Sequence, residues 1–308
     1  MVKGRVVGYA RDTGLVFIYD PSPPWVHPRA TDGKVVVLKE PFRALVADAP
    51  LSASPRTGRV RPLMAGVSIG NARITAGTLG WFGRLDGEIV IISNAHVLTD
   101  RPESPNPPVN PVIVQPGPID GGILFRDRVA YYHSHVPIEV IGESDCPVAN
   151  LFVSSLNWLL ERLGRKTRLR AVVEPRNKVD VALATLDKGV EYIPAVMGDD
   201  GNPVKTSSKF VGLLFAGSGE YYIVSKASNI LTYYPGLRLI GATPAEVKVG
   251  DRVVKCGRTT GCTEGEVVST NAVVRVLYAT GEAVFEDVIV VKGKSAGGDS
   301  GSSVWLLQ

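Results

Sequence analysis

Residues 297–302 read Gly-Gly-Asp-Ser-Gly-Ser and are the most informative stretch of this 308-residue chain. A serine hydroxyl is a weak nucleophile unless a neighbouring base removes its proton. It also needs backbone N–H donors directed at the oxyanion that develops during acyl transfer. Glycines before and after Ser300 let the backbone turn tightly and direct the N–H groups of Gly298 and Ser300 to one point. The stretch therefore predicts a nucleophilic serine with an oxyanion hole, against the alternative of a Gly/Ser-rich turn.

A candidate base is His96, at the end of the apolar run Ile91-Ile92-Ser93-Asn94-Ala95-His96. Imidazole titrates near neutrality, which suits it to proton transfer. The alternative is a structural histidine in the core. Of the other histidines, His27 lies in a Pro-rich loop, and His133 and His135 have no Cys, Asp or Glu at ligand spacing. We therefore expect His96 to be the base, and we expect no metal site.

A candidate partner for this base is Asp180, inside the apolar run Val179-Asp180-Val181-Ala182-Leu183. A carboxylate in such a run costs free energy unless it is paired. A histidine N–H would keep it ionised and would fix the tautomer of the base. The alternative is an acid that faces solvent at a strand end, which Asp187 fits better.

The rest of the sequence favours an all-β fold. It contains 33 glycines and 22 prolines, and many short Val/Ile-rich runs are bounded by turn residues. The dipeptide Asp86-Gly87 between two such runs predicts a tight hairpin. The expected strands near the N-terminus and around this hairpin are Arg5–Tyr9, Leu15–Tyr19, Lys34–Lys39, Thr78–Phe82 and Glu88–Ile92.

Two segments have helical spacing instead. Apolar residues recur every three or four positions over 147–163, which predicts a helix that packs on a barrel rather than one that meets a membrane or a partner. A short helix is expected over Lys226–Thr232, and a long Pro/Gly/Asn loop over 102–122.

Turn-rich stretches suggest where the chain divides. Residues 51–62 are typical of a linker, and residues 196–208 are polar and contain Gly and Pro. We therefore expect an N-terminal module or arm (1–50), a first barrel with His96 and Asp180 (51–195) and a second barrel with Ser300 (196–308).

Composition excludes several function classes. The formal charge is +4 with Lys and Arg dispersed, which does not indicate nucleic-acid binding. The sequence shows neither a signal-peptide core nor an apolar run long enough to span a membrane, so a cytoplasmic protein without a membrane or cofactor partner is expected. Three cysteines argue against a disulfide framework; Cys256 and Cys262 could bridge a hairpin, but reduced thiols are favoured.

The three motifs together resemble the trypsin-like serine peptidases of the chymotrypsin fold. Ser-Asn-Ala-His-Val-Leu, Val-Asp-Val-Ala-Leu and Gly-Gly-Asp-Ser-Gly-Ser occur in that family's chain order. The resemblance implies two six-stranded β-barrels and a triad of His96, Asp180 and Ser300. Further stretches are similar to a prokaryotic cytoplasmic group of these peptidases: residues 32–37, Ala76–Gly80, Val114–Pro118 and Cys256–Gly261.

The resemblance also implies an unusual strand order. In the family the nucleophile is followed by more strands and a helix, whereas here eight residues follow Ser300. Phe210–Ser218 resembles the strand expected next, which would make Phe215, Ala216 and Gly217 substrate-binding. We therefore predict a circularly permuted second barrel rather than a truncated one. By this resemblance, Lys294 lies at the base of the first specificity pocket. There it would either favour acidic side chains of the substrate or point to solvent.

The expected function is a serine endopeptidase that acts on a peptide or protein substrate through an acyl-enzyme on Ser300. The alternatives are a peptide-binding barrel without activity and an esterase that uses the same triad. In the family, the acid that matches Asp299 pairs with a freed N-terminus after activation. Because the sequence shows no obvious activation site, either Asp299 has another partner or the enzyme is made active. The sequence does not indicate an oligomeric state.

Overall fold

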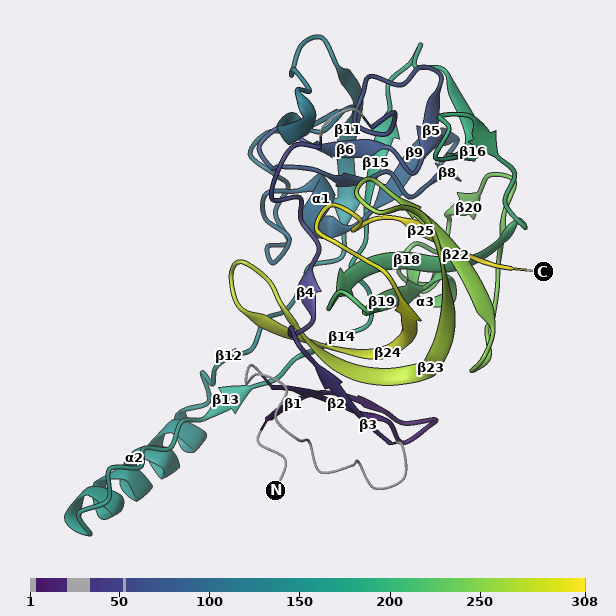
Figure 1. Ribbon diagram of the computed structural model, residues 1–308. Helices are drawn as coiled ribbons and strands as arrows, with labels where there is room; N and C mark the ends of the chain where they lie inside the picture. Colours follow the sequence, from purple (N-terminus) through teal and green to yellow (C-terminus); the bar gives the residue numbers. More distant parts are fainter. Residues whose placement is uncertain (1–3, 21–33, 52–53, 308) are drawn as a thin grey trace.

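A computed structural model describes residues 4–20, 34–51 and 54–307 of the chain (Figure 1). Strands dominate, and they curl into two barrels of the chymotrypsin type, which confirms the expected fold class. His27 and residues 32–33 lie outside the described residues.

The first barrel is a closed ring of antiparallel strands. β7 runs through Leu79 and Gly80 into β8, so the two act as one bent strand. In ring order the strands are β6 (Ser68–Asn71), β7 (Gly77–Thr78) with β8 (Trp81–Leu85), β9 (Glu88–Ser93), β15 (Ala182–Leu186), β11 (Arg128–His135) and β10 (Val112–Val114), which pairs with β6 again. The β8–β9 hairpin confirms the Asp86-Gly87 prediction. Both turn residues have positive φ, at 49° and 85°, as a turn matched to strand twist requires.

The second barrel closes in the same way. In ring order its strands are β22 (Arg252–Gly257), β23 (Gly261–Leu277), β24 (Glu282–Gly293), β19 (Tyr221–Lys226), β18 (Lys209–Gly217) and β25 (Ser303–Leu306), which returns to β22. β18, the first of these six strands along the chain, therefore lies beside β25, which follows Ser300.

Aromatic side chains join the two barrels. Trp81 of the first barrel packs edge-on against Trp305 of the second, with ring centroids 4.5 Å apart, and Phe210 packs on Trp305 at 5.4 Å. All three are buried. One hydrophobic cluster thus extends across both barrels, and the site described below lies at the junction between them, which we call the cleft.

The N-terminal strands attach to the second barrel. β1 (Arg5–Ala10) pairs with β2 (Val16–Tyr19) and with β23, and β2 pairs with β3 (Val35–Leu38). These strands agree with the predicted runs. β4 (Arg43–Ala44) then leaves this layer and pairs with β18 (Figure 1).

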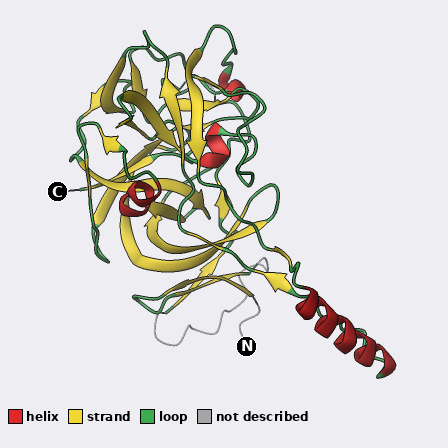
Figure 2. Ribbon diagram, turned by 180° about the vertical axis from the view of Figure 1, so that it is seen from behind, coloured by secondary structure: helices red, strands yellow, loops and turns green. Residues whose placement is uncertain are grey.

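Helix α2 (Pro147–Arg162) contradicts one prediction. It projects away from both barrels (Figures 1 and 2), and none of its residues is buried. Leu151 and Phe152 are 70% and 65% exposed. The ribbon of β12 (Gly142–Glu143) and β13 (Val172–Val173) carries the helix outward, so the predicted packing on a barrel is wrong.

The other elements are short. The predicted helix at 226–232 is α3 (Ala227–Tyr233), and the loop predicted over 102–122 contains β10 and a 3-10 turn at Pro118–Asp120. The remaining elements are α1 (Ala95–Leu98), β5 (Leu63–Ala65), β14 (Arg176–Asn177), β16 (Tyr192–Met197), β17 (Pro203–Val204), β20 (Arg238–Leu239) and β21 (Thr243–Pro244).

The stretch 51–62, which the sequence predicts as a linker, is packed against the barrels at Arg56. Arg56, within the stretch 51–62, is buried and donates hydrogen bonds to Gly66 O (3.1 Å) and Asp199 Oδ1 (2.8 Å). This part of the stretch is therefore packed rather than a free linker. β20 pairs with β8 of the first barrel although it follows strands of the second, so the limits 51–195 and 196–308 stay predictions.

Cys256 and Cys262 are joined in a disulfide, whereas the sequence favoured reduced thiols. They lie directly opposite each other in the β22–β23 pair, where the side chains share one face. Among the described helices, none is long and apolar enough to cross a membrane.

Candidate active site

The pairing of β9 with β15 brings His96 and Asp180 together. His96 lies in α1 just after β9, and Asp180 lies just before β15. His96 Nδ1 and Asp180 Oδ2 are 2.5 Å apart, and both side chains are buried. The N–H of Ala95 donates to the other oxygen, Oδ1, at 2.7 Å. Two donors thus compensate the cost of a buried carboxylate and fix the ring with Nδ1 towards the acid.

A third donor to Asp180, Tyr278, was not singled out from the sequence. Its hydroxyl donates to Asp180 Oδ2 at 2.8 Å, and its ring packs edge-on against His96. Burial, and then the negative charge of Asp180, raise the pKa of Tyr278 well above its ordinary value, so it remains a donor. Tyr278 follows β23 of the second barrel, so only the tertiary fold brings it to an acid of the first.

Ser300 lies across the cleft from α1. A Cβ on Gly77 would lie 2.4 Å from Val97 Cγ2 and 2.9 Å from Ser300 O, so Gly77 permits the close approach of these segments. The Ser300 hydroxyl donates to Phe215 O and accepts from Leu45 N–H, each at 3.0 Å. No hydrogen bond joins it to His96 among the described residues. His96 Nε2 is buried and has no hydrogen-bond partner there.

The expected oxyanion donor Gly298 already holds a peptide oxygen. Gly298 has φ +95°, which a side chain would strain. Its N–H donates to Leu45 O at 2.5 Å, and its own carbonyl accepts from Thr78 Oγ1 at 2.8 Å. The glycine amide thus faces the cleft while the first barrel fixes the peptide plane behind it.

Asp299 has a structural partner inside the second barrel. Lys255 Nζ lies 2.9 Å from Asp299 Oδ2, and both side chains are fully buried. Burial lowers the pKa of Lys255, and Asp299 acts in the opposite direction. The carboxylate also accepts from Thr259 N (2.9 Å), Thr260 N (3.0 Å), Thr260 Oγ1 (2.6 Å) and Ala296 N (3.1 Å). The loop that presents Gly298 is therefore fixed without a freed N-terminus.

The predicted substrate-binding residues differ in placement. The ring of Phe215 packs on Phe285 with centroids 4.5 Å apart, so only its backbone faces Ser300. Ala216 and Gly217 pair with β4. Lys294 is exposed and lies in a different depression, which it shares with Glu220 and Glu264.

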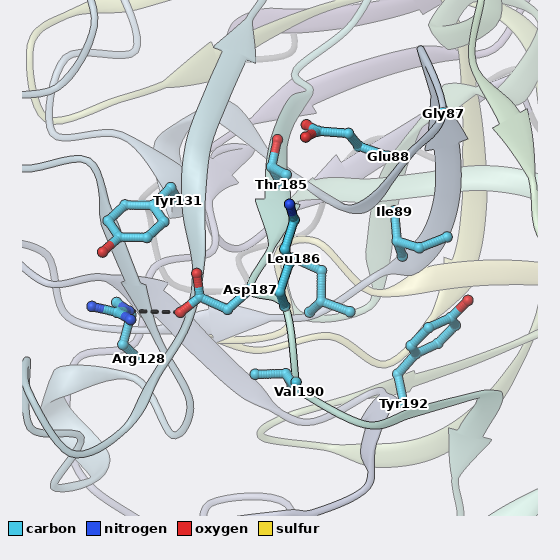
Figure 3. Close-up of a pocket in the computed structure, with 12 residues that line it drawn as sticks. Gly87, Glu88, Ile89, Arg128, Tyr131, Thr185, Leu186, Asp187, Val190 and Tyr192 are labelled. Atoms are coloured by element: carbon cyan, nitrogen blue, oxygen red, sulfur yellow. Dashed lines mark hydrogen bonds and ion pairs between the residues drawn. The ribbon is translucent and has the colours of Figure 1, made fainter.

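A separate hollow lies at the far turns of the first barrel (Figure 3). It has a volume of about 690 Å³ and includes the ion pair Arg128–Asp187, with Nε and Oδ2 2.6 Å apart. It shares no residue with the His96–Asp180 pair. No cluster of three or more His, Cys, Asp or Glu side chains suited to a metal ion occurs in the described part of the chain.

Comparisons with known proteins give structural likenesses only. No family profile and no curated protein matches the sequence. One similar solved structure is Thermobifida fusca protease A, with 13% identity and a TM-score of 0.39; the match covers 78% of this chain and 76% of that one. A serine protease specific for glutamic acid has 15% identity and a TM-score of 0.40, and the match covers 79% of this chain and 92% of that one. Cellulomonas bogoriensis chymotrypsin has 16% identity and a TM-score of 0.37, and the match covers 78% of this chain and 75% of that one. The fold assignment rests on the two closed rings of strands rather than on these similarities.

Proposed function

We propose that this protein is a serine peptidase that hydrolyses peptide bonds through an acyl-enzyme on Ser300. One observation carries the proposal. An extended peptide segment lies in the cleft beside the buried His96–Asp180 pair, with its carbonyl oxygen on Gly298 N–H and its N–H on Ser300 Oγ. The first contact is the one that a substrate carbonyl makes with an oxyanion donor, and the second places the same residue beside the nucleophile.

The chemistry follows from the positions of the atoms. Asp180 holds Nδ1 of His96 as the N–H, which leaves Nε2 free to accept the proton of Ser300. Ser300 Oγ attacks the carbonyl carbon, and the N–H groups of Gly298 and Ser300 stabilise the oxyanion. His96 then gives the proton to the leaving amine, and water clears the ester.

One observation favours the second candidate, a peptide-binding barrel without activity. Ser300 Oγ donates to Phe215 O and not to His96. Rotation about the Cα–Cβ bond of Ser300 would exchange one contact for the other, and such rotamer changes are fast compared with catalysis. The esterase alternative is less favoured, because the cleft accommodates a peptide backbone over several residues.

Labelling with a fluorophosphonate probe tests the proposal. A reactive Ser300 takes up the probe, whereas Ser300→Ala does not and loses on the order of 10⁴-fold or more of any peptidase rate. Ser302→Ala is the matched control, since among the described residues the Ser302 hydroxyl hydrogen-bonds only to the Asp299 carbonyl, which also accepts the Ser302 N–H. Probe uptake that persists unchanged in Ser300→Ala would refute the proposal. A protein that turns over small esters and no peptide would point to the esterase.

We also propose that the second barrel is a circular permutant of the trypsin-like one. Its support is the place of β18 between β19 and β25, next to the strand that follows Ser300. The Ser207 hydroxyl donates to Leu306 O at 2.5 Å, so a short loop can join these two points. The prediction can be tested with a variant in which the segment that begins with β18 is moved to follow Leu306, joined by a short loop. This variant should fold and keep Ser300 reactive. Loss of folding with loops of several lengths would count against the permutation.

A further inference from the structure

The segment in the cleft belongs to the protein itself. It comprises residues 43–49, which we call the cleft segment, and it follows the N-terminal strands. We propose that the cleft segment is the enzyme's own substrate and that Ser300 cleaves the Leu45–Val46 bond within the same molecule. This inference rests on the proposed peptidase function and adds a site of self-processing and a preferred residue before the cleaved bond.

The register before the bond is set by strand pairing. Ala44 lies opposite Ala216 and Arg43 opposite Gly217, in antiparallel orientation. Upstream, Phe42 is buried and its carbonyl accepts from Leu277 N–H at 2.9 Å. Added-strand binding of this kind fixes which residue reaches the nucleophile, because a shift by one residue would turn every side chain to the opposite face.

Leu45 is the residue that reaches the nucleophile. Its N–H contacts Ser300 Oγ and its oxygen contacts Gly298 N–H. The carbonyl carbon lies one bond from that oxygen and two bonds from that nitrogen, so it is held between the hydroxyl and the oxyanion donor. No other carbonyl of the cleft segment bonds to Gly298 among the described contacts.

The Leu45 side chain fills an apolar site in the second barrel. It is 8% exposed and belongs to a cluster with Val211, Leu214, Tyr222 and Val224. A Cβ on Gly217 would lie 3.0 Å from Leu45 Cδ1, so this glycine leaves the room that the leucine occupies. The site therefore selects a leucine-sized apolar residue before the cleaved bond, and the exposed Lys294 does not contribute to it.

The register after the bond is fixed by both barrels. Ala47 N–H donates to Ala76 O at 3.1 Å. Arg258, held by the buried carboxylate of Asp120, donates from Nη2 to Ala49 O at 3.0 Å. The cleft segment is thus held on both sides of the Leu45–Val46 bond, as a substrate is, and is not merely plugged into one pocket.

The catalytic machinery does not wait for a cleavage to assemble. The Lys255–Asp299 pair already fixes the Gly298 loop. A first cleavage within the intact chain is therefore possible. Ser300 rotates to His96 Nε2, its oxygen bonds to the Leu45 carbonyl carbon, and the bond to Val46 N breaks. His96 passes the hydroxyl proton to the new Val46 amine, and water hydrolyses the Leu45 ester to the carboxylate.

Intact mass measurement under denaturing conditions tests the proposal on the full-length protein. The wild type should give two fragments that end at Leu45 and begin at Val46, and Ser300→Ala should stay intact, also when wild type is added. The half-time of the cleavage should not change over a hundred-fold dilution, because the reaction is within one molecule.

Leu45→Asp should slow the cleavage on the order of 100-fold, because it buries a carboxylate among apolar groups. Leu45→Met keeps the volume and should be cut like the wild type.

Probe labelling of the same variants separates failure of this inference from failure of the proposed function. Leu45→Asp should release the segment and expose Ser300 to the fluorophosphonate probe. An intact wild type together with a labelled Leu45→Asp would overturn self-cleavage and leave the peptidase standing. A wild type and a Leu45→Asp variant that are both intact and unlabelled would refute both. Cleavage at another bond, or cleavage of Ser300→Ala by added wild type, would also overturn the inference.

Discussion

Replacement of Lys255 by methionine should destabilise the protein by removing one half of a buried ion pair. Lys255 Nζ and Asp299 Oδ2 are 2.9 Å apart with neither side chain exposed. Methionine keeps most of the apolar stem and deletes the charge. Removing one partner of such a pair usually costs about 3–5 kcal/mol, because the other charge stays buried.

The contacts of Asp299 place the expected cost at the lower end of that range. Three backbone N–H groups and the Thr260 hydroxyl still donate to the carboxylate after the substitution. We therefore expect a loss of about 3 kcal/mol in the free energy of unfolding. For a protein of this size, the melting temperature should fall by roughly 5 °C.

Urea unfolding at pH 7 measures the first quantity, and the double variant Lys255→Met/Asp299→Asn is its control. Asparagine carries no charge and still accepts from the backbone donors, so the double variant should regain about half of the loss or more. Activity should fall with Lys255→Met as well, because the lost ion pair helps to fix Asp299 in the loop that presents Gly298. A Lys255→Met variant within about 1 kcal/mol of the wild type, or a double variant less stable than the single one, would refute the reasoning.

Two further predictions concern Tyr278 and Asp12. Tyr278→Phe should lower kcat/KM about 3–10-fold, because one hydrogen bond to the Asp180 carboxylate is lost while the Ala95 N–H still donates to it. The acid limb of the pH profile of kcat/KM should move to higher pH. An unchanged acid limb would contradict a role of Tyr278 through the triad. Burial would raise the pKa of Asp12, but hydrogen bonds, chiefly from Ser269 and Thr270, outweigh it and lower the pKa. A lowered carboxyl pKa stabilises the fold above the unfolded value near 3.9, and this contribution is lost as the pH falls through the folded value. Asp12→Asn should therefore be slightly less stable than the wild type at pH 5–8, by less than about 1 kcal/mol, and the difference should shrink below about pH 4; a constant difference in thermal melts would disprove the linkage.

The sequence by itself was sufficient for the fold class and for the pairing of the base with its acid. Alternating apolar runs and the Asp86-Gly87 turn are local signals, and local signals determine strands and hairpins. His96 and Asp180 were identifiable because each stands at the end of, or inside, an apolar run, where a polar group requires a partner. The link from Ser300 to His96 stays a prediction, since the hydroxyl contacts Phe215 and Leu45 instead.

Tertiary structure alone decided what surrounds these residues. Helix α2 has the apolar spacing of a packed helix, yet the β12–β13 ribbon carries it away from the barrels. The direction of such a ribbon depends on tertiary contacts and cannot be predicted from a local sequence pattern. Lys255 is 44 residues from Asp299 and Tyr278 is 98 from Asp180, so each pair exists only because distant strands close into barrels. The same holds for the cleft segment, in which residues 44–47 form a short apolar run with no chemically distinctive side chain. Strand pairing with β18 is what brings the Leu45 carbonyl to Gly298, because backbone contacts depend on register and not on side-chain identity.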